Sequence, residues 1–123
     1  MDGTTDVTRT FHFGKPTQEE KDSYTRVLLG NLDVERVRWP KTANITGGDI
    51  DVLARRHLWS ANKDYMHGTG HGVGYFLGVH EGPCGISKYN TTIFKPNMIV
   101  TNEPGYYEAG KYGIRIENIL VVN

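Results

Sequence analysis

Four side chains of the kinds that hold divalent metal ions lie at expected strand positions or in glycine-rich turns of this sequence. Three are carboxylates and one is an imidazole, a donor set that suits Mn²⁺, Co²⁺ or Zn²⁺ better than soft metals. An acid on the interior face of a sheet needs a cation or a hydrogen-bond donor, because an unpaired buried charge is very costly. Spacing alone does not distinguish such acids from solvated surface charges, which are commoner. The four residues are Asp6, His71, Glu103 and Glu117.

The segment His67–Gly74 (HGTGHGVG) is the least ordinary stretch of the chain. It holds two histidines four residues apart and four glycines in eight residues. Histidines at this spacing can share one metal from a helix, but each glycine costs a helix about 1 kcal/mol relative to alanine. Glycine instead allows close approach of backbone and substrate. A glycine-rich turn with structural histidines is the plainer interpretation, but a third histidine in Val79–Pro83 (VHEGP) favours a functional site.

The N-terminal part of the sequence predicts a strand followed by a helix. Residues 4–13 alternate between a threonine-rich face that carries Asp6 and a face with valine and phenylalanine, which is typical of a strand. Thr17 and Glu20 form a capping-box signature. The helix that follows is expected to end before the Trp39-Pro40 step, since the residue before proline avoids helical angles.

A second helix and two further strands complete the expected elements. The apolar residues of 50–58 recur at helical spacing and give one apolar stripe. Met98–Thr101 and Ile114–Val122 predict strands, with turns expected at Pro104-Gly105 and Gly110. This order predicts an α+β domain, with two helices on one face of a mostly antiparallel sheet.

Composition limits the classes of partner. The 123 residues are enough for one domain, and 14 basic residues balance 14 acidic ones. Nucleic-acid and membrane-surface partners are not expected, because both favour a basic excess. No apolar run reaches the roughly 20 residues of a membrane span, and the N-terminus lacks the apolar core of a signal peptide. A single cysteine, Cys84, favours the cytoplasm, although sequons at Asn44 and Asn90 point weakly towards secretion.

Five short motifs follow one another along the chain: Asp2–Thr10, His67–Gly74, Val79–Pro83, Thr101–Tyr107 and Gly113–Asn118. In this order they resemble the motifs of aminopeptidase P, the Xaa-Pro aminopeptidase family, and the resemblance spans essentially the whole chain. Five motifs in series are far more specific than any one of them. The resemblance implies a pita-bread fold, which also serves methionine aminopeptidase, prolidase and creatinase. It also implies peptide substrates with proline in the second position.

The resemblance assigns a role to each candidate residue. The implied metal ligands are Asp6, His71, Glu103 and Glu117. Asp6 and Glu117 would bridge two divalent ions, with manganese as the expected metal and zinc or cobalt as alternatives, and the ions would activate a water. His67 and His80 would contact the substrate around the scissile bond and stabilise the tetrahedral intermediate. Glu103 would also carry a proton to the leaving nitrogen of proline.

The family pattern has a further metal-binding aspartate upstream of Asp6, and Asp2 is too close to Asp6 to replace it. We therefore expect residues 1–123 to form the C-terminal half of a pita-bread catalytic domain, with little activity alone. Apolar surface and a strand edge should then be exposed, and pairing of two copies as a homodimer is a further expectation. A non-catalytic binding module and a prolidase-type dipeptidase are the alternatives. Retention of all the available ligands and both histidines favours the peptidase.

Other residues near these motifs have plainer expected roles. Arg115 shares a strand face with Glu117 and is expected either to balance a ligand's charge or to form a surface ion pair. His12 and His57 match no motif and are expected to be structural or exposed. Cys84 has no base partner and is expected to be a packing residue. The remaining aromatic candidates for core or pocket walls are Trp39, Trp59, Tyr106 and Tyr107.

Overall fold

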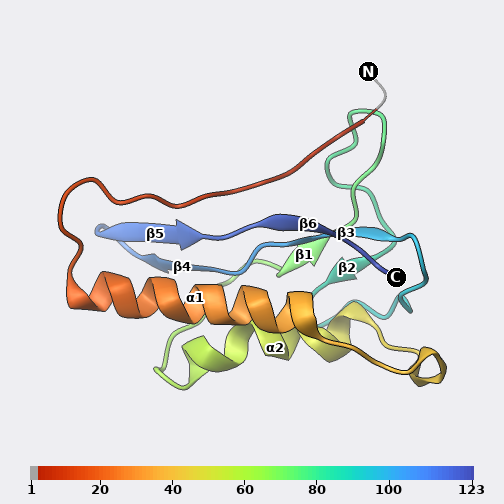
Figure 1. The fold of residues 1–123 in the computed structure, drawn as a ribbon, viewed down its shortest axis with the longest axis horizontal. Coiled ribbons are helices and arrows are strands. Elements are labelled where there is room, and N and C mark those ends of the chain that lie inside the picture. The colour runs from red at the N-terminus through yellow and green to blue at the C-terminus, as the bar shows by residue number, and fades with distance from the viewer. Residues whose placement is uncertain (1–2) are drawn as a thin grey trace.

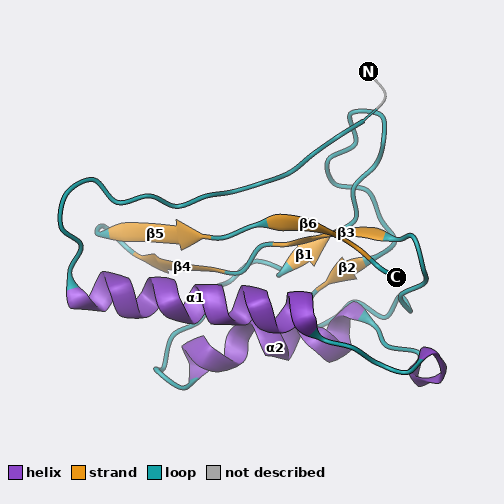
Figure 2. Cartoon of the chain, in the orientation of Figure 1, coloured by secondary structure: helices purple, strands orange, loops and turns teal. Residues whose placement is uncertain are grey.

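The computed structural model of the chain describes residues 3–123, and Met1 and Asp2, which begin the first motif, lie outside the described residues. Within this range the chain forms two α-helices, a short 3-10 helix and six strands (Figure 1). The strands pair in three two-stranded antiparallel sheets. Both helices lie on the same side of the strands, and the N-terminal segment runs along the other side (Figure 2). The predicted α+β class is confirmed.

Helix α1 (Gln18–Arg36) begins at the predicted capping box. The Thr17 side chain accepts a hydrogen bond from the Glu20 backbone at 3.1 Å, and the Glu20 carboxylate accepts one from the Thr17 backbone at 2.8 Å. The helix ends at Arg36, before the Trp39-Pro40 step, as predicted. These contacts satisfy two of the backbone groups that a helix start otherwise leaves unpaired.

Helix α2 (Gly47–Trp59) buries the predicted apolar stripe and packs across α1. A second capping box, between Thr46 and Asp49, begins it. The two helices approach closely at Gly30, where a Cβ atom would lie only 2.2 Å from the carbonyl oxygen of Ala54. Glycine is therefore required at this crossing, because any larger residue would force the helices apart. No helix among residues 3–123 is long and apolar enough to cross a membrane.

The prediction of a strand over residues 4–13 is wrong, although the predicted alternation is correct. From Thr4 to Thr10 the even-numbered residues, Asp6 among them, are half-buried and their odd-numbered neighbours are exposed, but the only bridge along this segment joins Thr8 to Glu117. Further along, the hydroxyl of Thr10 accepts from the backbone N–H of Arg115 at 3.0 Å and donates to its carbonyl at 2.8 Å. The Thr10 side chain thus makes the two hydrogen bonds to the Arg115 backbone that a neighbouring strand would make with its own backbone.

The C-terminal strands form two antiparallel pairs placed end to end, of which the inner pair in sequence is a hairpin. Strand β3 (Ile99–Asn102) pairs with β6 (Asn118–Val121), and β4 (Gly105–Glu108) pairs with β5 (Tyr112–Arg115). The single strand predicted over residues 114–122 is therefore divided in two. The turn predicted at Pro104-Gly105 is not present, and Gly105 is instead the first residue of β4. Gly110 lies in a turn with a φ of +72°, as expected. The break between β3 and β4 falls at Glu103, and the break between β5 and β6 falls at Glu117.

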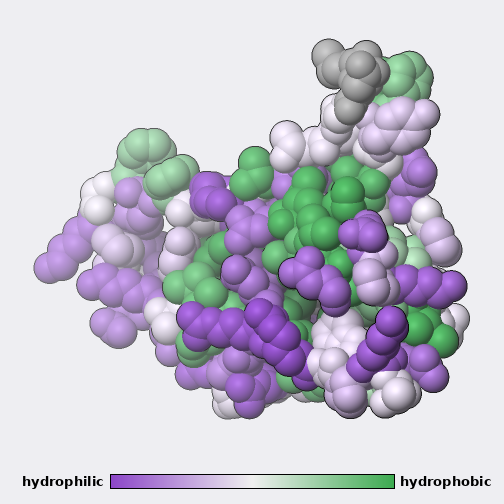
Figure 3. All heavy atoms as spheres, turned by 45° about the vertical axis from the view of Figure 1, so that its right-hand side comes forward, coloured by the Kyte–Doolittle hydropathy of each residue, from purple (hydrophilic) through white to green (hydrophobic). Residues whose placement is uncertain are grey.

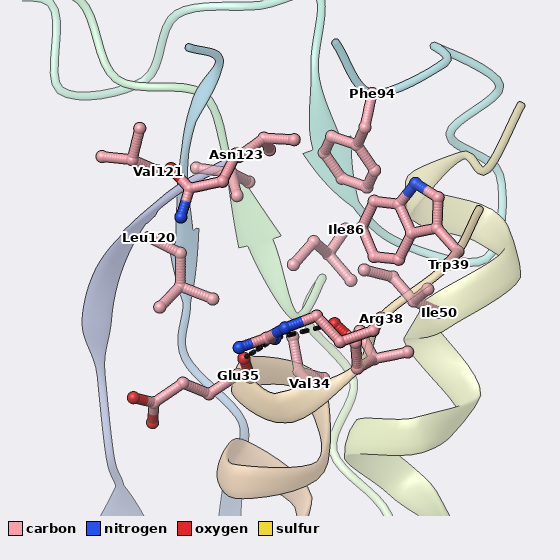
Figure 4. A pocket seen from close by; sticks show the side chains of 13 residues that line it. Val34, Glu35, Arg38, Trp39, Ile50, Ile86, Phe94, Leu120, Val121 and Asn123 are labelled. Carbon is pink, nitrogen blue, oxygen red and sulfur yellow. Dashed lines mark hydrogen bonds between the residues drawn. The ribbon is translucent and has the colours of Figure 1, made fainter. Parts of the chain in front are cut away.

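Two further strands, β1 (Gly70–His71) and β2 (Gly85–Ile86), pair within the glycine-rich region. The core consists of two clusters, one around Val34, Ile86 and Phe94 and one around Val27 and Leu58. The first cluster opens into a hollow of about 300 Å³ beside Trp39 and Leu120 (Figure 4). On the face shown in Figure 3, apolar side chains gather in an area bordered by polar ones.

Candidate metal centre

Four segments of the chain bring the predicted ligands together. Asp6 lies on the N-terminal segment, His71 on β1 and Glu117 between β5 and β6, and each offers a ligand atom within 4.8 Å of those of the other two. Glu103 joins the group through His71, whose Nε2 lies 3.0 Å from Glu103 Oε1 and 3.4 Å from Asp6 Oδ2. The spatial grouping expected from the sequence is therefore present in the fold.

The interruptions between the strand pairs direct both glutamates into this group. In place of ladder partners, the Glu103 N–H donates to the carbonyl of Thr69 at 2.7 Å, and the Glu117 N–H donates to the carbonyl of Thr8 at 3.1 Å. The HGTGHGVG segment and the N-terminal segment are thereby tied to the backbone of the two acids. The hydroxyl of Thr8 also donates to the Glu117 carboxylate.

His71 has a defined orientation. Its Nδ1 lies 2.9 Å from the carbonyl oxygen of Gly72. A carbonyl can only accept, so Nδ1 carries a hydrogen, and Nε2, on the side of the carboxylates, is the ring nitrogen available to a metal ion. This is the tautomer that a metal ligand needs. The strand carrying His71 packs tightly, because a Cβ at Gly70 would lie 1.8 Å from the carbonyl oxygen of Thr101.

Thr101 contacts two of the candidate ligands, although no role was predicted for it within its motif. Its side chain is fully buried, accepts a hydrogen bond from the His71 backbone at 3.0 Å and donates one to Glu103 Oε1 at 2.9 Å. It therefore orients two of the four candidate ligands. The available signal was its place two residues before Glu103 on a strand, which puts both side chains on the same face.

The electrostatics of the group favour a cation. Glu117 is only 2% exposed. Burial raises the pKa of Glu117 above its ordinary value, and the nearby charges of Glu103 and Asp6 raise it further, against the opposing effects of Thr8 and Arg115. Three acids sharing a partly buried site repel one another. A divalent ion would relieve this repulsion, so the donor set fits a hard or borderline metal.

His67 lies beside this group but is held by other partners. Its Nδ1 is 2.7 Å from the carbonyl of Gly68 and its Nε2 is 2.8 Å from the hydroxyl of Tyr107, which also accepts from Arg115 Nε at 2.9 Å. Because the carbonyl only accepts and the guanidinium only donates, Nδ1 carries a hydrogen and the Tyr107 hydroxyl donates to Nε2. Burial lowers the pKa of His67, which keeps the ring neutral at pH 7.

Tyr107 and Arg115 link His67 to the candidate ligands. Arg115 Nη1 lies 3.6 Å from Glu103 Oε2, so of the two outcomes expected for Arg115 the structure favours charge balance, directed at Glu103. Tyr107 was expected only to line a core or pocket. Its hydroxyl instead joins two segments 40 residues apart, a contact that no local pattern in the sequence indicates.

A buried network holds the backbone behind His67. Arg55 on α2 pairs with Asp51 at 2.9 Å and donates to the carbonyls of Tyr65 and His67 at 2.7 and 2.9 Å. The second carboxylate oxygen of Asp51 accepts from the hydroxyl of Thr69 at 2.6 Å. The side chains of Arg55 and Asp51 on α2 thus hold the glycine-rich segment in place, although its glycines have no side chains to pack.

His80 is exposed and faces the centre rather than joining it. Its ring centroid lies 4.1 Å from that of His71, at an interplanar angle of 65°. The loop that carries it is closed by a hydrogen bond from the Glu81 N–H to the Gly72 carbonyl at 2.9 Å and by one from the Gly74 N–H to the Gly78 carbonyl at 2.7 Å. An exposed imidazole at this place can contact a bound substrate.

The residues expected to play no part in the site lie as predicted. His12 is exposed and lies 3.2 Å from Glu20. His57 is half-buried and pairs with Asp33 at 2.8 Å. The Cys84 thiol donates to a backbone carbonyl at 3.5 Å, and burial raises its pKa, which disfavours the reactive thiolate.

Comparison with known proteins gives a consistent result. Xaa-Pro aminopeptidase 1 of Dictyostelium discoideum is 59% identical over 125 residues, which cover 99% of this chain and 20% of that protein. A probable Xaa-Pro aminopeptidase P of Coprinopsis cinerea is 58% identical over 124 residues, 98% of this chain and 20% of that protein. The chain therefore spans about a fifth of the length of these curated relatives.

Solved structures agree in fold. X-prolyl aminopeptidase from Caenorhabditis elegans, described as a cytosolic enzyme with a di-nuclear active site, superposes with a TM-score of 0.88 at 45% identity, over 95% of this chain and 19% of that one. The prolidase from Pyrococcus horikoshii OT3 superposes with a TM-score of 0.86 at 33% identity, over 97% and 33% of the two chains. The expected pita-bread fold is therefore confirmed. The model of metallopeptidase family M24 matches residues 1–123, and with the agreement in sequence and fold this shows that the chain belongs to that family.

Proposed function

We propose that this chain is the metal-binding half of the catalytic domain of an Xaa-Pro aminopeptidase, which hydrolyses the bond between an N-terminal residue and a following proline. The observation that carries the proposal is the convergence of Asp6, His71 and Glu117, with Glu103 against His71, in a chain that is 59% identical to Xaa-Pro aminopeptidase 1 of Dictyostelium discoideum. Each of these residues has a physical role in a hydrolytic metal site, which is a stronger basis than fold alone.

The proposed metal ligands are Asp6, His71, Glu103 and Glu117. Manganese is the metal we favour, with zinc or cobalt as alternatives, because the donors are three hard carboxylates and one imidazole. In the intact enzyme we propose two ions, bridged by Asp6 and Glu117. When bound, such ions lower the pKa of a water and stabilise the negative charge that develops on the substrate carbonyl.

The other residues of the site would act on the substrate. His67 is neutral, and the Tyr107 hydroxyl fixes the direction of its ring. His80 is exposed next to His71 and would contact the substrate around the scissile bond, where a donor stabilises the developing charge. Glu103 is held by Thr101 and faces Arg115, and it would carry a proton to the leaving nitrogen of proline.

We also propose a cellular setting and an assembly. The chain has a single cysteine, and the similar enzyme from Caenorhabditis elegans is described as cytosolic, which together favour the cytoplasm. The expected partners are peptides with proline in the second position and a second copy of the same protein. Large apolar side chains such as Phe13, Met66 and Tyr89 are exposed on this half-domain, which is compatible with further contacts.

A prolidase-type dipeptidase is the second candidate, because the prolidase from Pyrococcus horikoshii shares the fold at 33% identity. A non-catalytic binding module is the third, and the presence of all four candidate ligands and both histidines argues against it. The three differ in substrate. An aminopeptidase cleaves longer peptides before proline, a prolidase cleaves dipeptides that end in proline, and a binding module cleaves neither.

A full-length protein that contains this sequence is expected to release the first residue of Arg-Pro-Pro peptides in the presence of Mn²⁺ and to leave Met-Ala peptides intact. Mass spectrometry of the products checks this directly. An Arg-Pro dipeptide serves as the control for prolidase activity. Release of methionine without cleavage before proline, or cleavage restricted to the dipeptide, would contradict the assignment.

A further inference from the structure

Asn31 lies in the C-terminal half of α1, inside the helix, and is only 1% exposed. Asparagine is a poor helix former, and a buried amide costs free energy unless it is hydrogen-bonded. An apolar residue at this position would pack against the strands at no such cost. The presence of a buried amide on the core side of a helix therefore points to a specific task.

The Asn31 amide nitrogen donates two hydrogen bonds, one to the end of β3 and one to the segment between β5 and β6. One goes to the carbonyl oxygen of Asn102 at 3.1 Å and the other to the carbonyl oxygen of Ile116 at 3.0 Å. These are the residues immediately before Glu103 and Glu117. Asn102 in turn donates from its side chain to the Asn31 carbonyl at 2.9 Å, so the helix and the strand are joined in both directions.

The two carbonyls lie at the interruption between the strand pairs. The β3–β6 register ends at Asn102 opposite Asn118, and the β4–β5 register begins at Gly105 opposite Arg115. Between these positions one hydrogen bond, from the Ile116 N–H to the Pro104 carbonyl at 3.3 Å, joins the two connecting segments. A regular ladder therefore does not set their separation at the point where both glutamates leave the backbone.

We propose that Asn31 is a positioning residue that sets the spacing of Glu103 and Glu117 in the metal centre; the inference rests on the proposed function. The two hydrogens of one planar amide have a fixed angle, so two carbonyls that accept from them are fixed relative to each other. Each carbonyl is one peptide bond from a candidate ligand. Asn31 acts from the helix side, whereas the N-terminal segment, which carries Asp6 and Thr8, runs along the other side of the strands (Figure 1).

The test is Mn²⁺ titration of the 123-residue chain by calorimetry, with Asn31→Leu compared with the unsubstituted chain. Leucine has a similar size and no donor. We expect Asn31→Leu to keep its circular dichroism spectrum and to bind Mn²⁺ at least about tenfold more weakly, which is the usual effect of losing a group that orients ligands. The matched control is Val34→Ala, a buried truncation on the same helix at a side chain that cannot hydrogen-bond, and it should bind within about threefold of the unsubstituted chain.

Equal affinity in Asn31→Leu, or an equal loss in Val34→Ala, would overturn the inference, since the second result would mean that only general stability matters. If Asn31→Leu does not fold, NMR of the unsubstituted chain decides. Addition of Zn²⁺ should shift both side-chain amide protons of Asn31, and unchanged resonances in a chain that binds the ion would refute the role. An unsubstituted chain that binds no Mn²⁺ would instead overturn the metal centre of the proposed function.

Discussion

Replacement of Glu117 by glutamine is expected to remove measurable Mn²⁺ binding while leaving the metal-free chain as stable as before, or more stable. The side chain is buried beside Asp6 and Glu103, so loss of its charge removes the attraction for a cation at the centre of the group. The same substitution also ends the repulsion among three acids. Affinity for the metal and stability without it should thus change in opposite directions.

The pH dependence gives a second readout for this variant. Burial and the neighbouring acids raise the pKa of Glu117 in the folded chain. The stability that this group contributes is therefore fully present below its unfolded pKa and is lost as the pH rises through the raised folded value. Thermal melts of the metal-free chain between pH 4 and pH 7 should show this loss, and Glu117→Gln should reduce it. Glu35→Gln, an exposed acid on α1, is the control and should change neither property.

Replacement of His80 by alanine in a full-length protein is expected to lower kcat about 10²–10³-fold with bound metal unchanged. The side chain is exposed and meets the His71 ring edge to face without entering the group of carboxylates, so we assign it to the substrate rather than to the metal. Steady-state kinetics gives kcat, and metal analysis of the same preparation gives the number of bound ions per chain. The control is His57→Ala, which should keep normal turnover, because His57 pairs with Asp33 on α1 and lies outside the site. Loss of an ion from His80→Ala would make His80 a ligand and our assignment wrong.

Local signals in the sequence predicted the elements that depend on local contacts. The capping box at Thr17 and Glu20 and the apolar stripe of α2 both involve residues within one or two helical turns, so the pattern contains the information needed. The candidate ligands were also predictable, because five motifs in a fixed order resemble one family. Their grouping in space followed from that resemblance and not from spacing.

The parts that were wrong or missed depend on contacts between distant segments. The strand predicted over 114–122 is divided at Glu117, whose N–H bonds to Thr8, 109 positions earlier in the chain. The extended segment at residues 4–13 lacks a ladder because Thr10 bonds Arg115 through its side chain. Periodicity cannot distinguish a ladder partner from a side-chain partner, because both leave the same alternation of buried and exposed residues.

The most direct test of the metal centre is anomalous diffraction at the manganese edge from crystals of the chain grown with Mn²⁺. We expect one peak per chain, coordinated by Asp6, His71 Nε2, Glu103 and Glu117, with His67 and His80 outside coordination distance. A second ion is not expected, because the bridging acids alone offer it too few ligands and the first ion would repel it. Two fully occupied peaks, or a peak bound by His67 or His80 in place of these residues, would contradict the account.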